Sequence, residues 1–144
     1  MQDGIKRAVV LGVVIALIIV VARKTFAYTD DDLYVLSHII SAEAGNCSED
    51  MMLSVGSVVL NRVADDRFPD TISEVVFQEG QYSPTWNGAY YNEPTEGAQK
   101  VAKRLLEEGT AIDASVVWQS NFPQGEGVYD TIESPFGTTM YFCF

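Results

Sequence analysis

The feature that most constrains this chain is an uncharged apolar run near its N-terminus. Residues 8–22 contain only Ala, Val, Leu, Ile and Gly, with Lys6 and Arg7 before them and Arg23 and Lys24 after them. A helix that is apolar on every face needs lipid around it or a protein much larger than 144 residues. We therefore predict that this run is an N-terminal membrane-targeting helix outside the folded domain.

Two outcomes for this segment stay open. The run is shorter than the roughly 20 apolar residues that cross a bilayer, but flanking Lys and Arg side chains can extend the span of a signal anchor. Thr25 and Ala27 have the small side chains and spacing of a cleavage site after Ala27, as in a signal peptide. We assign residues 1–27 to one or the other, and residues 28–144 to a domain that is membrane-anchored or secreted outside the cytoplasmic membrane.

The folded part of the chain is strongly acidic. Five of the nine basic residues but nineteen of the twenty acidic residues lie after residue 27. Such a surface repels nucleic acid and anionic lipid head groups, so we expect no nucleic-acid partner. A neutral polymer outside the membrane is compatible with it.

The two cysteines are Cys47 and Cys143, and both leave the cytoplasm if the leader interpretation holds. A Cys47–Cys143 disulfide can then form, and two free thiols are the alternative. One histidine and two distant cysteines do not make a zinc set, and no glycine motif that cradles phosphates occurs. We expect no metal and no other cofactor.

Helical patterns dominate the rest of the chain, and an extended pattern ends it. Thr29, Ser48 and Thr71 are N-cap residues for three helices, and Pro94 and Gly109 bound a fourth. We expect a loop over 79–92 and an antiparallel sheet from 116–118 and 138–144. The predicted fold class is α+β, a mainly helical domain with a small antiparallel sheet.

Glu43 is the candidate for chemistry. It follows Leu36, Ile39 and Ile40 by seven, four and three residues, so it continues the apolar stripe of the first helix. Burial and the C-terminal end of the helix dipole both favour the protonated carboxyl group. Such a group can donate a proton to a glycosidic oxygen. The alternative is a carboxylate in solvent at a frayed helix end.

Four blocks of sequence carry a resemblance to a known family. Residues 41–45, 55–63, 68–72 leading to 75–78, and 81–84, in this order, resemble the catalytic domain of the SleB/CwlJ-type spore-cortex-lytic cell-wall hydrolases. The resemblance covers roughly residues 33–144. It implies a lysozyme-like domain that cleaves peptidoglycan between N-acetylmuramic acid and N-acetylglucosamine as a lytic transglycosylase, with Glu43 as its catalytic acid and base.

That chemistry needs one acid, whereas most glycosidases use two carboxylates. Glu49, Asp50 and Glu79 remain candidates for a second carboxylate, with surface charge as the alternative role. The chain departs from the family in the final strand, where residues 137–142 lack its usual polar or histidine position. This departure puts a contribution of that strand to the site in doubt.

Aromatic and amide side chains suit the faces of pyranose rings. We predict that a sugar groove is lined by Gln81, Tyr82, Ser83, Trp86 and Tyr90. Core packing is the alternative for each aromatic residue. Asn61 and Arg62 are expected to hold loops near the site through hydrogen bonds, with a plain surface role as the alternative for Arg62.

Two rival functions are kept. The first is a cysteine peptidase or amidase that uses Cys47 at the start of the second helix, with His38 as the only available base. The second is a non-catalytic wall-binding membrane accessory protein, for which the N-terminal segment and the aromatic loop suffice.

Overall fold

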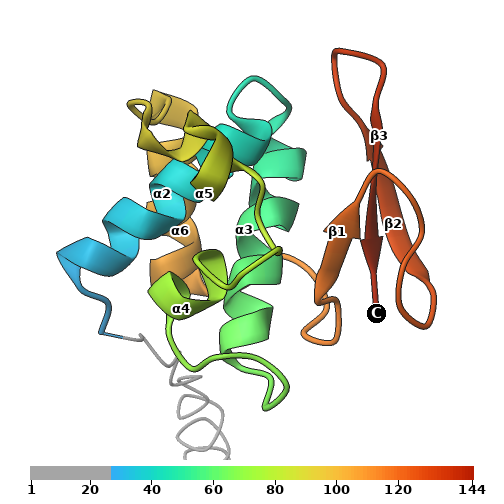
Figure 1. Cartoon of the computed structure of the whole chain (residues 1–144), viewed down its shortest axis with the longest axis horizontal. Coiled ribbons are helices and arrows are strands. Elements are labelled where there is room, and N and C mark those ends of the chain that lie inside the picture. The colour runs from blue at the N-terminus through green and yellow to red at the C-terminus, as the bar shows by residue number, and fades with distance from the viewer. Residues whose placement is uncertain (1–26) are drawn as a thin grey trace, which may run out of the picture.

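The computed structural model describes residues 27–144, and the predicted membrane-targeting helix over 8–22 lies outside that range. None of the helices from residue 27 onward is long and apolar enough to cross a membrane. The described elements are α2 Asp30–Ala44, α3 Glu49–Val63, α4 Ile72–Val76, α5 Pro84–Asn87, the 3-10 helix η1 Ala89–Tyr91, α6 Glu96–Glu108, β1 Trp118–Ser120, β2 Val128–Glu133 and β3 Thr139–Cys143 (Figure 1). The mainly helical fold with a small sheet is confirmed.

Helix α2 begins where its capping sequence predicts. The Thr29 hydroxyl accepts a hydrogen bond from the Asp32 N–H at 3.1 Å, and the Asp32 carboxylate accepts one from the Thr29 N–H at 2.9 Å. These two bonds satisfy N–H groups that a helix start leaves without partners. Ser48 caps α3 with a single bond, in which its hydroxyl accepts from the N–H of Met51 at 3.3 Å.

Helices α2, α3 and α6 pack against one another at Gly56. Leu36, Ile39 and Ile40 on α2 are fully buried, as the stripe predicted. A Cβ atom on Gly56 of α3 would lie 2.6 Å from Cδ1 of Ile40 and would also collide with Leu105 of α6. The missing side chain therefore permits a close approach of three helices.

The predicted loop over 79–92 is more ordered than its sequence indicates. It contains α5, with Pro84 in the first turn, and η1, in which Tyr90 is buried. Elements of three or four residues are too short to show helical periodicity, and tertiary packing fixes them.

The sheet has the order β1-β3-β2 and is antiparallel throughout. Trp118 pairs with Cys143, and Thr131 pairs with Tyr141. The sequence did not predict β2, because most of its residues are exposed and it lacks a buried alternating face. Its hydrogen bonds to β3 define it, and those depend on a pairing that local sequence does not encode.

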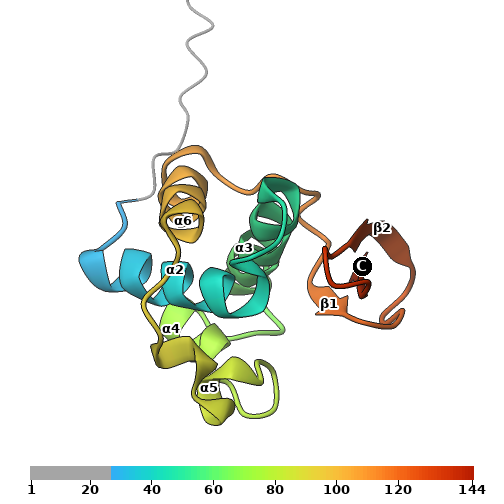
Figure 2. The ribbon, with the colours of Figure 1, turned by 90° about the horizontal axis from the view of Figure 1, so that it is seen from above.

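The sheet lies on the side of α3 that faces away from α6 (Figure 2). The Asn61 side-chain amide donates hydrogen bonds to the carbonyl oxygens of Asp113 and Val116, at 2.8 and 2.9 Å. The Arg62 Nε donates to the carbonyl oxygen of Val117 at 2.7 Å. Both side chains are buried. These hydrogen bonds connect the segment before β1 to α3, so the predicted hydrogen-bonding role is confirmed. The alternative of a surface role for Arg62 is wrong.

The disulfide prediction is wrong in this structure, where both cysteines are free thiols. Cys143 is buried in β3, and Cys47 is half-buried in the loop between α2 and α3. The alternative prediction, two free thiols, is therefore confirmed.

Candidate active site

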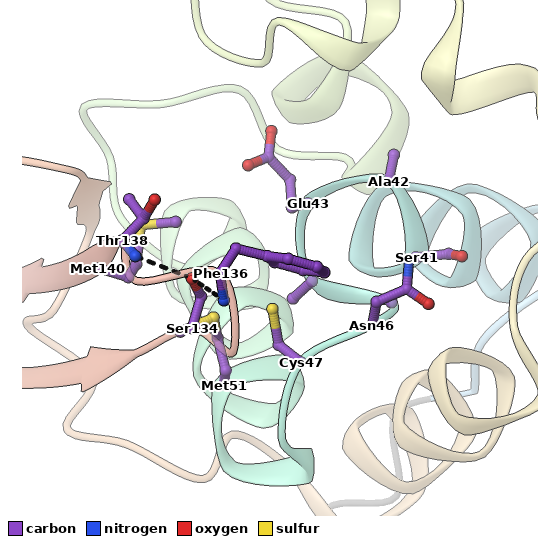
Figure 3. Close-up of a pocket in the computed structure, with 12 residues that line it drawn as sticks. Ser41, Ala42, Glu43, Asn46, Cys47, Met51, Ser134, Phe136, Thr138 and Met140 are labelled. Atoms are coloured by element: carbon purple, nitrogen blue, oxygen red, sulfur yellow. Dashed lines mark hydrogen bonds between the residues drawn. The ribbon is translucent and has the colours of Figure 1, made fainter.

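A pocket opens where the β2–β3 hairpin faces the end of α2 and the start of α3. Figure 1 shows the hairpin tip and the loop after α2 at the same end of the molecule. The pocket has a volume of about 280 Å³. Its lining residues are Ser41, Ala42, Glu43, Ala44, Gly45, Asn46, Cys47, Met51, Ser134, Phe136, Thr138 and Met140 (Figure 3).

Glu43 occupies this pocket from the last turn of α2. Its neighbours Ile40 and Ala44 are buried, whereas the Glu43 side chain itself is partly exposed toward the pocket. Burial raises the pKa of Glu43 to about 7 from an ordinary value of 4.5. The carboxyl group is therefore in reach of a ligand and can hold or release a proton near neutral pH.

No second carboxylate lines the pocket with Glu43. Glu49 instead accepts an ion-pair contact from Arg104 at 3.0 Å, with both side chains largely exposed. Asp50 and Glu79 are exposed elsewhere. This arrangement suits chemistry in which one group gives and takes the proton, and it does not suit a paired-carboxylate mechanism.

The hairpin supplies one wall of the pocket, which the sequence analysis did not foresee. Ser134, Phe136, Thr138 and Met140 lie at its tip and on the first part of β3. The last strand lacks the family's polar or histidine position, but the turn before this strand supplies side chains to the pocket wall. The run Ser-Pro-Phe-Gly-Thr over 134–138 was a readable turn signal.

None of the five residues predicted to line a sugar groove lies in the Glu43 pocket. Tyr82 and Tyr90 are buried at 2% exposure each. Gln81, Ser83 and Trp86 are exposed, with Trp86 at 65% on α5. Their contact with sugar remains a prediction, and for Tyr82 and Tyr90 the flat faces are covered by protein.

Arg62 is a buried cation that packs among three aromatic rings. The Arg62 guanidinium carbon lies 5.1 Å from the ring centroid of Phe68, 5.3 Å from that of Tyr82 and 5.4 Å from that of Trp118. The Tyr82 hydroxyl and the Arg62 Nη1 are buried without a hydrogen-bond partner among the described residues. Burial raises the pKa of Tyr82 to about 12, with the Arg62 charge opposing the shift and the Glu43 charge adding to it.

His38 and Cys47 do not form a catalytic pair. His38 donates a hydrogen bond from Nδ1 to the carbonyl oxygen of Tyr90 at 2.8 Å and stacks on Tyr34 at a centroid distance of 4.1 Å. Cys47 lines the Glu43 pocket, where burial raises the pKa of its thiol. A raised pKa disfavours the thiolate that a nucleophile needs. The cysteine peptidase or amidase hypothesis is therefore not favoured.

Fold and site together define a mainly helical domain with one carboxylic acid, whose pKa is raised to about 7, in the wall of an open pocket. A family model described as Cell Wall Hydrolase matches residues 46–122, which is more than half of the chain. The chain belongs to this cell wall hydrolase family. Glu43 lies three residues before the matched segment, so its assignment depends on the structure and on the family resemblance of residues 41–45.

Several spore cortex-lytic enzymes are similar to this chain. The Oceanobacillus iheyensis enzyme is 26% identical over 102 residues, which are 71% of this chain and 33% of that protein. The Bacillus subtilis enzyme is 24% identical over 121 residues, which are 81% of this chain and 36% of that protein. The chain thus spans about a third of the length of these curated relatives.

Two solved structures share the fold. The catalytic domain of the germination-specific lytic transglycosylase SleB from Bacillus anthracis superimposes with a TM-score of 0.65 at 20% identity, over 82% of this chain and 98% of that one. The catalytic domain of the Bacillus cereus SleB protein gives a TM-score of 0.66 at 20% identity, over 86% and 99%. The domain described here therefore corresponds to nearly the whole of each catalytic domain.

Proposed function

We propose that this protein cleaves the glycan strands of peptidoglycan as a lysozyme-like lytic transglycosylase, with Glu43 as the only catalytic acid and base. The observation that carries the proposal is a lone carboxyl group whose pKa is raised to about 7 in an open pocket. Family membership and the names of the similar proteins supply the substrate class.

The reaction uses Glu43 twice. The protonated carboxyl group gives its proton to the oxygen that joins N-acetylmuramic acid to N-acetylglucosamine, and the C1–O4 bond breaks. Glu43, now ionised, takes the proton from the muramic 6-hydroxyl as that oxygen bonds to C1 and closes an anhydro ring. The carboxyl group is protonated again at the end, and no water is consumed. A pKa near the working pH suits a group that must do both.

Digestion of purified sacculi by the full chain tests this mechanism. Mass spectrometry of the soluble products should find anhydromuramic ends, each lighter by one water than an ordinary reducing end. Glu43→Gln should release nothing while keeping the wild-type circular dichroism spectrum. Hydrated reducing ends from the wild-type chain would mean that the enzyme is a hydrolase.

Glu79→Gln is the matched control, because it removes an exposed carboxylate outside the pocket. It should digest sacculi like the wild type. Loss of activity in this variant would indicate a second essential carboxylate. Binding of sacculi without any release would instead favour a wall-binding accessory protein.

We also propose that the domain works outside the cytoplasmic membrane. The basic-flanked apolar run over 8–22 and a substrate in the wall support this placement. Fractionation of cells that express the full chain separates an anchored protein from a secreted one. Digestion of spore cortex and vegetative wall in parallel identifies the preferred wall.

A further inference from the structure

The wall of the pocket opposite α2 carries an unusually bare aromatic ring. Phe136 is 73% exposed, the highest value among the exposed large hydrophobic side chains of residues 27–144. In the view of Figure 3 its ring reaches from the hairpin across the pocket, between Glu43 and Cys47. Single exposed apolar residues are common, but this one faces a pocket that contains an acid.

The turn that carries Phe136 is tied down by its own hydrogen bonds. The Ser134 hydroxyl accepts bonds from the N–H groups of Phe136 and Thr138, at 3.3 and 3.1 Å. The Ser134 N–H donates to the carbonyl oxygen of Thr138 at 2.8 Å. Gly137 has φ +81°, a conformation that glycine adopts without strain. The ring is therefore presented by a pre-organised turn, which lowers the entropic cost of binding a ligand.

Sulfur-containing side chains form the floor beside this ring. Cys47, Met51 and Met140 line the same pocket. In the view of Figure 3 the sulfur atoms of Cys47 and Met51 lie below the Phe136 ring, and the sulfur atom of Met140 lies beside Thr138. Burial keeps the Cys47 thiol protonated, so this surface carries no charge. Such side chains are polarizable and adapt to small apolar groups such as a methyl.

Polar groups complete the pocket. Asn46, Ser41 and Thr138 line it together with Glu43. A pocket with one aromatic face, an apolar floor and a polar rim is suited to a ligand that is amphipathic and uncharged. The surrounding acidic surface disfavours anionic ligands. An N-acetylated sugar has these properties, with an apolar ring face, hydroxyl groups and an acetyl methyl.

We propose that Phe136 is the stacking platform of a sugar subsite next to Glu43, where it contacts the pyranose ring of an N-acetylhexosamine unit while the sulfur floor receives the acetyl methyl. The inference rests on the proposed function and deepens it by naming a subsite. Loss of an aromatic contact of this kind should weaken binding by about tenfold, which corresponds to about 1.4 kcal/mol.

Binding of small sugars tests the subsite separately from catalysis. The full chain is titrated with triacetylchitotriose and with cellotriose, which has the same ring skeleton without acetyl groups, and binding is followed by NMR chemical shifts. We expect chitotriose to bind more tightly than cellotriose. Phe136→Ala should weaken chitotriose binding about tenfold, and Phe136→Tyr, which keeps the ring, should restore it.

Phe122→Ala is the matched control, since Phe122 is 55% exposed in the connection after β1 and does not line the pocket. It should bind chitotriose like the wild type. On sacculi, Phe136→Ala should raise KM while the released fragments still carry anhydro ends.

The two proposals fail in different ways. Equal chitotriose binding by the wild type and Phe136→Ala would overturn the subsite, even if anhydro ends are found. Equal binding of chitotriose and cellotriose would overturn the role of the sulfur floor. Chitotriose binding that depends on Phe136, with no anhydro ends from the wild type, would support the subsite and overturn the transglycosylase reaction.

Discussion

The guanidinium carbon of Arg62 lies 5.3 Å from the centroid of the Tyr82 ring, and the two side chains are only 3% and 2% exposed. The Arg62 Nε has a backbone partner, but Nη1 and the Tyr82 hydroxyl have none among the described side chains and backbone. Buried polar groups left without hydrogen bonds reduce stability. Such groups near the candidate acid indicate that this region is shaped for function as well as for folding.

Tyr82→Phe should separate the effect of the hydroxyl group on stability from its effect on activity. Because the hydroxyl is buried without a partner, its removal should leave the free energy of unfolding unchanged or raise it by up to about 1 kcal/mol. The same change should slow sacculus digestion if the hydroxyl serves the substrate or Glu43. Urea unfolding and fragment release measure the two effects. A stable variant with full activity would limit Tyr82 to packing.

Tyr91→Phe is the control for that experiment. Tyr91 is 66% exposed and lies outside the Glu43 pocket. Neither its unfolding free energy nor its rate of fragment release should differ from the wild type.

Arg62→Met should destabilise the domain. It removes a hydrogen bond of 2.7 Å to the carbonyl oxygen of Val117 and the contacts of a cation with three aromatic rings. Together these should cost about 2 to 4 kcal/mol. Urea unfolding gives the value. Arg67→Met provides the comparison, because Arg67 is exposed and its pair with Asp65 is screened by solvent, so its removal should change the free energy of unfolding much less. Equal losses in both variants would contradict a special role for the buried cation.

Alkylation of Cys47 should block the pocket without any role for the thiol in catalysis. Cys47 is half-buried beside Glu43, whereas Cys143 is fully buried. A bulky maleimide should therefore react with Cys47 first and stop digestion. Cys47→Ala should still release fragments with anhydro ends and should resist the reagent. Loss of all activity in Cys47→Ala would instead support the cysteine peptidase hypothesis.

The helical part of the fold could be predicted from the sequence because its signals are local. Thr29 and Ser48 mark helix starts, and the spacing of Ile39, Ile40 and Glu43 identifies the buried face that places the acid. The pocket could not be predicted in the same way. Its second wall comes from residues 134–140, more than ninety positions away from Glu43 in the sequence.

The aromatic predictions show the same limit. Composition identified sugar-compatible side chains in residues 81–90 but could not separate buried rings from exposed ones. Tyr82 is covered by Arg62, and Phe136 is bare, although each follows polar and turn-forming neighbours. Which ring faces a pocket depends on tertiary contacts, and the local sequence pattern does not encode them.

The stability of the domain should depend on pH through Glu43. Its pKa is about 7 in the folded chain and near 4.5 without burial. As pH rises through this window, the unfolded chain releases the proton first while the folded chain still holds it. The free energy of unfolding should therefore fall across the window and level off above about pH 7, by a total on the order of 3 kcal/mol.

Glu43→Gln cannot ionise at this position and should lack that fall. Urea unfolding at about pH 4 and about pH 8 compares the two proteins, and the other carboxylates cancel in the difference because both chains carry them. The variant and the wild type should be equally stable at the acidic pH, and the variant should be more stable at the basic one. A constant difference at both pH values would mean that Glu43 ionises normally in the folded chain. Its proton would then be lost well below neutral pH, and the single-acid mechanism would lose its donor.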